Sequence, residues 1–371
     1  MKTLFTTMFC IGYLCLAAQK PGKPLNVFII TTDGFRWQEV FTGADSTLIH
    51  KTSIVKDTSL VLQQYWDADA AARRQKLMPF LWNVVAKKGQ LYGNRLLNNK
   101  VDVANIYKIS YPGYNEILTG YADNKFVPNT PVNNLNTNIL EYLNEQPDYE
   151  GKVAAFSSWN VIPHILNQER NDFTINGGYD MLEEDEDSTN MFVNQVQQNA
   201  VKTHTRYDML TYVSAKEYIM QNHPKAVFLG FGETDEYAHK SRYDMYLQKA
   251  NDVDRMIGEL WYYVQTDPFY KDNTIFIITT DHGRGKKQST WWTHSLLTKG
   301  SGEAWMAIIG PGISPMGEMN GEFQAYQKQI APTIAMLLGE KFEANHPIAK
   351  PLALPMTKQT ILNKNMVAFQ K

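Results

Sequence analysis

Apolar runs in this chain repeatedly end in acidic residues. The run 27–30 is followed by Thr-Thr-Asp33-Gly34, and the run 275–278 is followed by Thr-Thr-Asp281-His282. A third run, 226–231, stops just before a Glu-Thr-Asp sequence. Uninterrupted apolar runs of this length are typical of parallel strands buried on both faces. We therefore predict strands over 26–32, 226–231 and 275–278, with further strands over 152–156 and 304–309.

Apolar positions three and four residues apart recur between these runs. The clearest stripe is Leu247, Ala250, Val253, Ile257 and Leu260, which is typical of an amphipathic helix. On the same grounds we predict helices over 77–88, from just after 110 to 120, and over 135–143, 211–221, 246–264 and 330–338.

The alternation of strands and helices predicts an α/β fold. We expect a doubly wound, mostly parallel sheet with helices on both faces. Residues 43–72 are polar and mixed, and we interpret them as loop. Residues 165–205 are polar, show no clear strand and contain the acidic cluster 183–187, so we interpret them as an insertion that caps the site. Residues 20–371 are expected to form one catalytic domain.

Composition narrows the class of protein. The chain has 371 residues, of which 43% are apolar, so it can bury a sizeable core. Its formal net charge of −2 gives no basic surface of the kind that binds nucleic acid. A small-molecule substrate is therefore a better expectation than a nucleic-acid partner. The oligomeric state does not follow from the sequence.

Residues 1–19 are expected to be a secretory signal peptide. Lys2 precedes an apolar segment over 4–16, and Ala17 and Ala18 provide small residues for cleavage. The apolar segment is shorter than the roughly 20 residues that span a bilayer. Both cysteines, Cys10 and Cys15, lie within it, so the mature protein would have no disulfide. These features favour export across the inner membrane to a periplasm, with no membrane span after signal removal.

Three predicted strands are followed by aspartates, and three histidines join them as candidate ligands. Asp235 and His239 are four residues apart, which places them on one face of a helical turn. Any one such residue is more often a turn cap or a packed ring than a ligand, but the joint pattern reverses that balance. Carboxylates and imidazoles together suit borderline metals such as zinc. We divide the candidates into two sets: Asp33, Asp281 and His282, and Asp235, His239 and His294.

Ser110 is the candidate nucleophile. It precedes Pro112-Gly113 at an expected strand-to-helix turn, where anionic groups are favoured. By itself it is better explained as a helix N-cap. Three protein ligands leave one position open on each ion, as in catalytic zinc sites, and two such ions can clamp a transferring phosphoryl group. A hydroxyl that contacts one of them has a lowered pKa and needs no general base, so Ser110 is also a candidate metal ligand.

The combined pattern resembles the alkaline phosphatase superfamily, most closely its nucleotide pyrophosphatase/phosphodiesterase branch, over residues 26–339. The resemblance implies two zinc ions, a phosphoserine intermediate and a small phosphate ester as substrate. It also implies that the ions are shared out as follows: one among Asp33, Ser110, Asp281 and His282, the other among Asp235, His239 and His294.

Two further features of this family bear on the substrate. One is an asparagine that holds a nonbridging phosphoryl oxygen. Asn134 is our candidate, and Asn129 and Asn133 are alternatives because the segment does not align securely. The other is a Lys-x-Arg clamp in monoesterases of this branch, where this chain has Trp159-Asn160-Val161. Since those cations are missing, phosphodiesters are the expected substrates, and a phosphomonoesterase is the alternative.

Other function classes stay open at this point. Sulfatases share the fold and begin their nucleophile motif as Ser110-Tyr111-Pro112 does, but they carry arginine where this chain has Tyr114. A sulfatase with one calcium ion also has no need of a second ligand set. A catalytically silent protein that binds phosphorylated or sulfated ligands is the remaining alternative. About two bound metals per chain would favour the enzyme over this binding protein.

Overall fold

The computed structural model describes residues 25–125, 129–183, 188–202 and 205–357. The expected signal peptide and residues 184–187 of the acidic cluster lie outside these described residues. Within them, no helix is both long and apolar enough to cross a bilayer.

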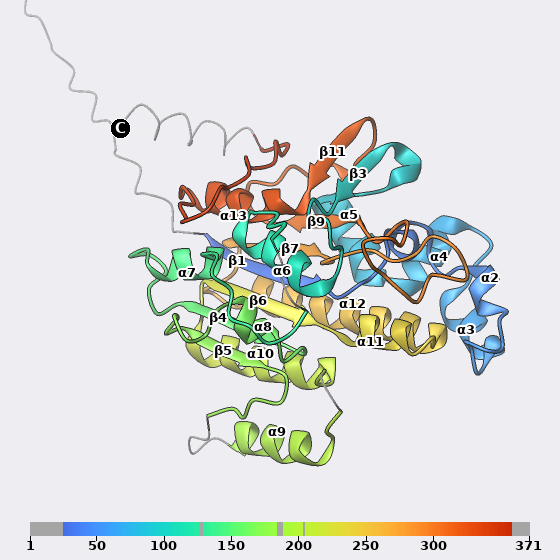
Figure 1. Cartoon of the computed structure of the whole chain (residues 1–371), viewed down its shortest axis with the longest axis horizontal. Coiled ribbons are helices and arrows are strands. Elements are labelled where there is room, and N and C mark those ends of the chain that lie inside the picture. The colour runs from blue at the N-terminus through green and yellow to red at the C-terminus, as the bar shows by residue number, and fades with distance from the viewer. Residues whose placement is uncertain (1–24, 126–128, 184–187, 203–204, 358–371) are drawn as a thin grey trace, which may run out of the picture.

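An eight-stranded sheet forms the middle layer (Figure 1). From edge to edge its strands are β10 (Gly317–Glu318), β2 (Gln90–Tyr92), β9 (Met306–Ile309), β7 (Thr274–Thr279), β1 (Asn26–Thr32), β6 (Ala226–Phe231), β4 (Val153–Ser157) and β5 (Thr174–Gly177). β1 pairs in parallel with β6 and β7, whereas β9 runs antiparallel to both of its neighbours. The prediction of a mostly parallel sheet is therefore confirmed.

A smaller sheet packs beside the first and contains β11 (Phe323–Tyr326), β3 (Asn99–Asp102) and β8 (Glu303–Ala304). The prediction of a single strand over 304–309 is wrong. Strand structure is interrupted at Trp305, so that β8 before it joins the smaller sheet and β9 after it joins the larger one. The Trp305 indole N–H donates to the carbonyl of Phe35 at 2.9 Å. This buried bond ties the break to the turn after β1.

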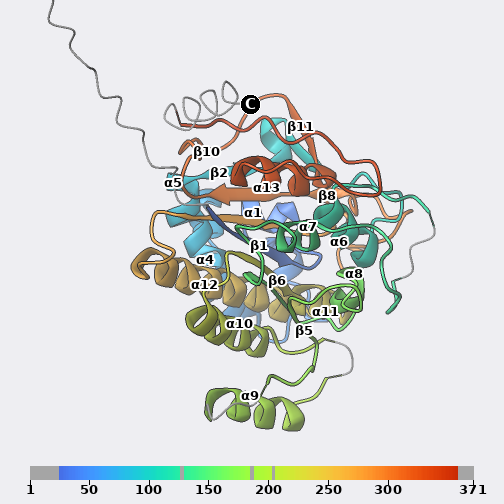
Figure 2. The same ribbon diagram turned by 90° about the vertical axis from the view of Figure 1, so that its left-hand side faces the viewer.

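Helices cover both faces of the large sheet, as the alternating side chains of β1 require. Phe28 and Ile30 pack in one core and Val27 and Ile29 in the other. The first core includes residues of α1 (Trp37–Thr42), α10 (Asp208–Asn222) and α12 (Tyr243–Thr266). The second includes residues of α6 (Ser110–Thr119), α7 (Ile139–Asn144), α8 (Ile162–Ile165) and α13 (Ile330–Leu338). Figures 1 and 2 show α12 and α13 on opposite sides of the sheet.

The segment 43–72 is not a loop as predicted. It contains α2 (Ser46–Ile49), α3 (Thr58–Tyr65) and the start of α4 (Ala70–Leu77). Each begins at an aspartate whose side chain accepts a backbone N–H: Asp45, Asp57 and Asp69. These short helices are set by their caps rather than by an apolar stripe. Shorter helical segments follow along the chain: η1 (Leu81–Val85), α5 (Ala86–Lys88), η2 (Arg95–Leu97) and η3 (Gln327–Gln329).

The described part of the insertion 165–205 extends the sheet. It contributes β5, a strand that the sequence did not predict, and α9 (Ser188–Asn199). β5 is short and carries Thr and Asn, so it lacks an apolar run. Figure 2 shows α9 on the far side of α10 from the sheet. Of the described residues of this segment, Thr205 alone lines the cleft described below.

Candidate metal centre and active site

The candidate site lies where three neighbouring parallel strands end. Asp33 directly follows β1, and Asp281 follows β7 by two residues. On the other side of β1, β6 leads into α11 (Glu233–His239), which carries Asp235. Because β1 pairs with both β6 and β7 in register, the three carboxylates emerge at the same edge of the sheet.

Asp33, Asp281 and His282 form the first group. One potential ligand atom from each lies within 4.8 Å of the other two. His282 Nε2 is 3.5 Å from Asp33 Oδ1 and 3.4 Å from Asp281 Oδ2. The backbone N–H of Gly34 donates to Asp281 Oδ1 at 2.9 Å and so fixes that carboxylate.

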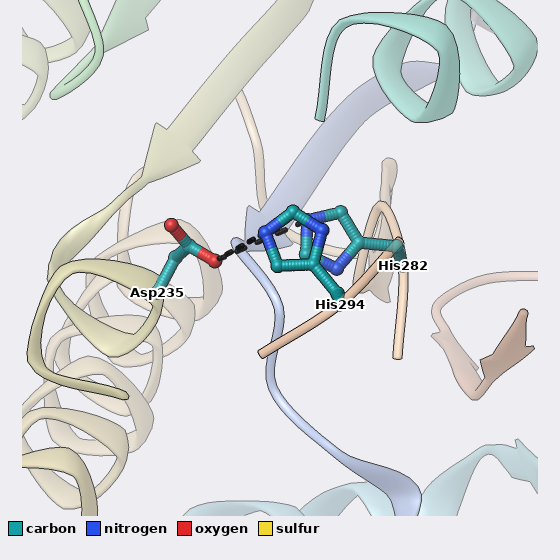
Figure 3. A group of neighbouring side chains, drawn as sticks. All are labelled: Asp235, His282 and His294. Carbon is teal, nitrogen blue, oxygen red and sulfur yellow. Dashed lines mark ion pairs between the residues drawn. The ribbon is translucent and has the colours of Figure 1, made fainter. Parts of the chain in front are cut away.

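Asp235, His282 and His294 form a second group within the same limit of 4.8 Å (Figure 3). The rings of His282 and His294 stack with centroids 3.8 Å apart, and His294 Nε2 is 3.5 Å from Asp235 Oδ1. His239 Nε2 lies 2.9 Å from His294 Nε2 and 3.4 Å from Asp235 Oδ2. The structure thus brings all six candidate ligands together, with His282 placed between the two groups.

Hydrogen bonds fix which ring nitrogens are free. His282 Nδ1 lies 2.9 Å from the carbonyl of Gly283, and His294 Nδ1 lies 3.3 Å from the carbonyl of Lys108. A carbonyl only accepts, so each Nδ1 carries the proton and each Nε2 presents a lone pair. Metal-bound histidines commonly donate a hydrogen bond from the ring nitrogen that does not bind the metal.

Divalent cations fit this set of donors. The buried Asp281 Oδ2 has no hydrogen-bond partner among the described residues. His239 Nε2 lies 2.9 Å from His294 Nε2, a contact in which one ring can donate to the other. Carboxylate oxygens that converge in a buried site repel one another unless a proton or a cation lies between them. The arrangement therefore suits metal ions of the zinc type.

Burial disfavours charge throughout the site. It raises the pKa of Asp33 to about 7, with a further contribution from the charge of Asp281. It also raises the pKa of Asp281 to about 7. Burial lowers the pKa of His282 and of His239. For His294, burial and the charge of the neighbouring His282 lower the pKa well below its usual range. Burial thus favours the neutral imidazoles, and a cation between the carboxylates would favour their ionised form.

Ser110 is the first residue of α6 and points into the first group. Its hydroxyl donates to Asp33 Oδ1 at 3.4 Å and lies 3.2 Å from His282 Nε2. The helix approaches closely because residue 113 is glycine: a Cβ there would stand 2.4 Å from the carbonyl oxygen of Asp281. The N-terminal end of α6, with its partial positive charge, therefore faces the space next to the hydroxyl.

Tyr114 distinguishes this site from the sulfatase pattern. Its hydroxyl donates to Asp33 Oδ2 at 3.2 Å, so a neutral, buried donor orients a candidate ligand where sulfatases have an arginine. The hydroxyl and the Ser110 hydroxyl occupy the two oxygens of the same carboxylate. Asp33 is consequently held from both sides.

A cleft of about 730 Å³ opens above these groups. Its lining residues are Asp33, Ser110, Asn129, Thr130, Pro131, Trp159, Asn160, Val161, Thr205, Gly232, Asp235, Glu236, His239, Lys240 and His294. Asn129 is among them, and its side-chain oxygen accepts the backbone N–H of Tyr111 at 2.8 Å. The amide of Asn129 therefore lies beside Ser110, the candidate nucleophile.

The structure places Asn134, the first choice from the sequence, outside the cleft lining. Its amide nitrogen donates to Asn115 Oδ1 at 2.9 Å, and its oxygen accepts the backbone N–H of Asn136 at 3.0 Å. Asn133 instead bonds to His164 Nδ1 at 2.8 Å. Asn134 and Asn133 thus anchor the loop, and Asn129 is the better placed of the three to hold a phosphoryl oxygen.

Paired alanine substitutions decide between these asparagines. For Asn129→Ala we expect kcat/KM for a phosphate ester to fall about 100-fold, because one donor to the developing negative charge is lost. For Asn134→Ala we expect mainly a lower melting temperature, since two loop hydrogen bonds are lost. Steady-state kinetics and thermal unfolding of both variants measure this. A larger kinetic loss in Asn134→Ala would contradict the assignment.

Comparison with known proteins agrees with this geometry. A model of the metalloenzyme superfamily matches residues 172–341, a range that contains Asp235, His239, Asp281, His282 and His294. The alkaline phosphatase PafA superposes with a TM-score of 0.58 at 11% identity, over 90% of this chain and 99% of its own. The chain has the fold of the alkaline phosphatase superfamily.

Two further structures share this superfamily fold. The phosphonate monoester hydrolase of Agrobacterium radiobacter aligns with a TM-score of 0.55 and 11% identity, over 89% of this chain and 76% of that one. The lipoteichoic acid synthase LtaP of Listeria monocytogenes aligns with 0.56 and 13%, over 89% and 75%. No curated protein sequence matches the chain significantly. The superfamily resemblance is confirmed, and the pyrophosphatase/phosphodiesterase branch stays a prediction.

Sequence reasoning missed one charged residue of this candidate site. Arg284 is buried and forms an ion pair with Asp235. Its position, two residues after the Asp281-His282 pair, was the available signal. A buried arginine is usually paired with an acid, and the acids nearest to such a position were the candidate ligands.

Proposed function

We propose that this protein is an exported two-zinc hydrolase of phosphoric esters, that phosphodiesters are its preferred substrates, and that Ser110 is its nucleophile. The observation that carries the proposal is the Ser110 hydroxyl, which lies 3.2 Å from His282 Nε2 and 3.4 Å from Asp33 Oδ1. A serine surrounded by candidate metal ligands and open to a cleft has a chemical role that a silent binding protein does not require.

Zinc at the two ligand groups would lower the pKa of the serine hydroxyl and offset the charge that develops on the phosphoryl and leaving-group oxygens. The chain supplies the rest. Asp33 orients the Ser110 hydroxyl, and Asn129 offers an amide beside it. Oγ of Ser110 bonds to phosphorus and its proton is lost to solvent, while the bond from phosphorus to the leaving oxygen breaks and that oxygen takes up a proton and departs as an alcohol. Water then hydrolyses the phosphoserine, which releases the remaining phosphate ester and restores the Ser110 hydroxyl.

The preference for diesters rests on the charge of the cleft. Trp159, Asn160 and Val161 line it where monoesterases of the suggested branch have two cations. Among the described lining residues Lys240 is the one lysine or arginine, and it pairs with Glu236. A diester carries one negative charge and a second organic group, and that group can pack against Trp159 and Val161. A monoester carries two negative charges, which this part of the cleft does not offset.

A substrate panel tests the proposal. Chromogenic phosphate diester, phosphate monoester and sulfate ester with the same leaving group are compared, with and without a chelator. We expect the diester to give the highest kcat/KM, by about tenfold or more over the monoester, which corresponds to one lost charge contact. We expect chelation to stop all cleavage.

The other outcomes point to other functions. A faster monoester would contradict the diester preference and favour a phosphomonoesterase. The fastest cleavage of the sulfate ester would favour a sulfatase. Absence of cleavage by zinc-loaded protein, together with tight binding of phosphate esters, would favour the silent binding protein.

A further inference from the structure

Arg284 connects three segments that carry candidate ligands. Its guanidinium donates from Nε to the carbonyl of Gly34 at 2.9 Å and from Nη1 to the carbonyl of Trp292 at 2.7 Å. Nη2 forms the ion pair with Asp235 Oδ1 and approaches the backbone carbonyl of the same residue at 3.3 Å. One planar group therefore joins the turn after β1, the start of α11 and the loop that leads to His294.

The guanidinium has little space to move. Its side chain has no exposed surface. Gly34 adopts a φ of +57°, and a Cβ at that position would stand 2.8 Å from Arg284 Nη2 and 2.9 Å from Asp235 Oδ1. Glycine at residue 34 thus leaves room for the guanidinium to reach Asp235. The five donors of an arginine in a fixed plane are well suited to hold three partners at set angles.

The position of the Asp235 carboxylate depends on its ion pair with Arg284. The group of Asp33, Asp281 and His282 depends less on this arginine. Arg284 holds Oδ1 of Asp235, while Oδ2 faces His239 Nε2 at 3.4 Å. The loop before His294 is tied to the same guanidinium through Trp292.

The first group has supports of its own. The N–H of Gly34 holds Asp281, the hydroxyl of Tyr114 holds Asp33, and the carbonyl of Gly283 orients His282. The guanidinium takes part in none of these three bonds, and it meets this group through its bond to the carbonyl of Gly34.

We propose that Arg284 is a positioning residue for one of the two metal ions, the ion held by Asp235, His239 and His294. It aligns Asp235 with the His294 loop so that their ligand atoms meet at one point, and its loss weakens that ion's binding while the other ion keeps its site. The inference rests on the proposed two-zinc site.

The test measures metal binding rather than turnover. Purified protein is stripped of metal and titrated with zinc by calorimetry, and cobalt is followed by visible absorption, for the wild type and Arg284→Met. We expect two binding steps in the wild type. In the variant we expect the affinity of one step to fall about 10- to 100-fold, as for other residues that orient metal ligands, with the other step changed less than about threefold.

Arg36→Met is the matched control. Arg36 is equally buried, pairs with Glu39 and donates to the carbonyl of Gly285 at 3.3 Å, so it touches the same loop without contacting a candidate ligand in any of its bonds. We expect this variant to melt at a lower temperature but to bind both ions with affinities close to those of the wild type. If Arg36→Met also binds one ion more weakly, the weaker binding in Arg284→Met reflects a less stable loop, and the positioning role of Arg284 is contradicted.

Arg284→Lys keeps the charge and loses the planar fork. We expect its weakened step to lie between the wild type and Arg284→Met, and this variant carries the test if Arg284→Met does not fold. Two steps of wild-type affinity in a folded Arg284 variant would overturn the inference and leave the proposed function intact. A wild type that binds only one ion would instead contradict the two-zinc function itself.

Discussion

Replacement of Ser110 by alanine is expected to abolish turnover while the protein keeps its two metal ions. The hydroxyl that attacks phosphorus is removed, and we expect kcat to fall by at least about 10³-fold. The candidate ligand carboxylates and imidazoles are unchanged, because within the described part of the chain the Ser110 hydroxyl donates one hydrogen bond to Asp33 and lies next to His282. Steady-state kinetics and elemental analysis of the same preparation measure both quantities.

Ser110→Thr is the matched control, because it keeps a hydroxyl at the start of α6. We expect it to retain activity within about tenfold of the wild type. Mass spectrometry of an acid-quenched reaction should find a phosphoryl group on the peptide that contains Ser110 in active protein and not in Ser110→Ala. Substantial turnover by Ser110→Ala would remove this residue from the mechanism.

Removal of the metal ions is expected to destabilise the protein, and more strongly at alkaline than at acidic pH. Burial raises the pKa of Asp33 and Asp281 to about 7 in the metal-free protein, against roughly 4 in an unfolded chain. Between these values the native state binds more protons than the unfolded state. The stability of the metal-free protein therefore falls as pH rises through this window and stays low above it.

Bound cations favour the ionised carboxylates, so their stabilising effect increases with pH over the same range. We expect the melting temperature of zinc-loaded protein to exceed that of stripped protein by roughly 5 °C or more at pH 8, and by less at about pH 5.5. Asp208 and Asp254 also have pKa values raised to about 7 by burial. They lie outside the two ligand groups and affect both forms alike, so the difference reports the site. A gap that shrinks as pH rises would contradict this account.

The central strands could be predicted from the sequence because each is a buried apolar run. Of these, β1 and β6 begin and end where predicted, and β7 extends one residue beyond the prediction at each end. α13 also matches its predicted span. The short strands at or next to the sheet edges could not be found in this way. β10 and β8 have two residues each, and β2 has three, which is too short for a periodic pattern to show.

Helix starts were missed where polar caps rather than apolar stripes define them. The helix predicted from 135 begins at Ile139, because Asn138 accepts the backbone N–H groups of Leu140 and Glu141. The stretch of polar residues around Asn138 offered several equally good capping positions. A single sequence gives no means to choose among them.

The sequence predicted that the six candidate ligands would lie close together, because the strands that carry the aspartates end at one edge of the sheet. It did not predict which side chains each of them contacts. The sequence assigned His282 to one group, whereas the structure places it between both, because its ring stacks on His294. The choice of Asn134 over Asn129 depended on the path of a loop whose turns carry no apolar pattern. The contacts of Arg284 span residues 34 to 292, and such long-range contacts are fixed only by the folded chain.

The most direct test of the central claim is a crystal structure of zinc-loaded protein with anomalous diffraction recorded on both sides of the zinc absorption edge. The account predicts two zinc peaks, one among Asp33, Asp281 and His282 and one among Asp235, His239 and His294, with Oγ of Ser110 in contact with the first. A single peak, or peaks distant from Ser110, would contradict it.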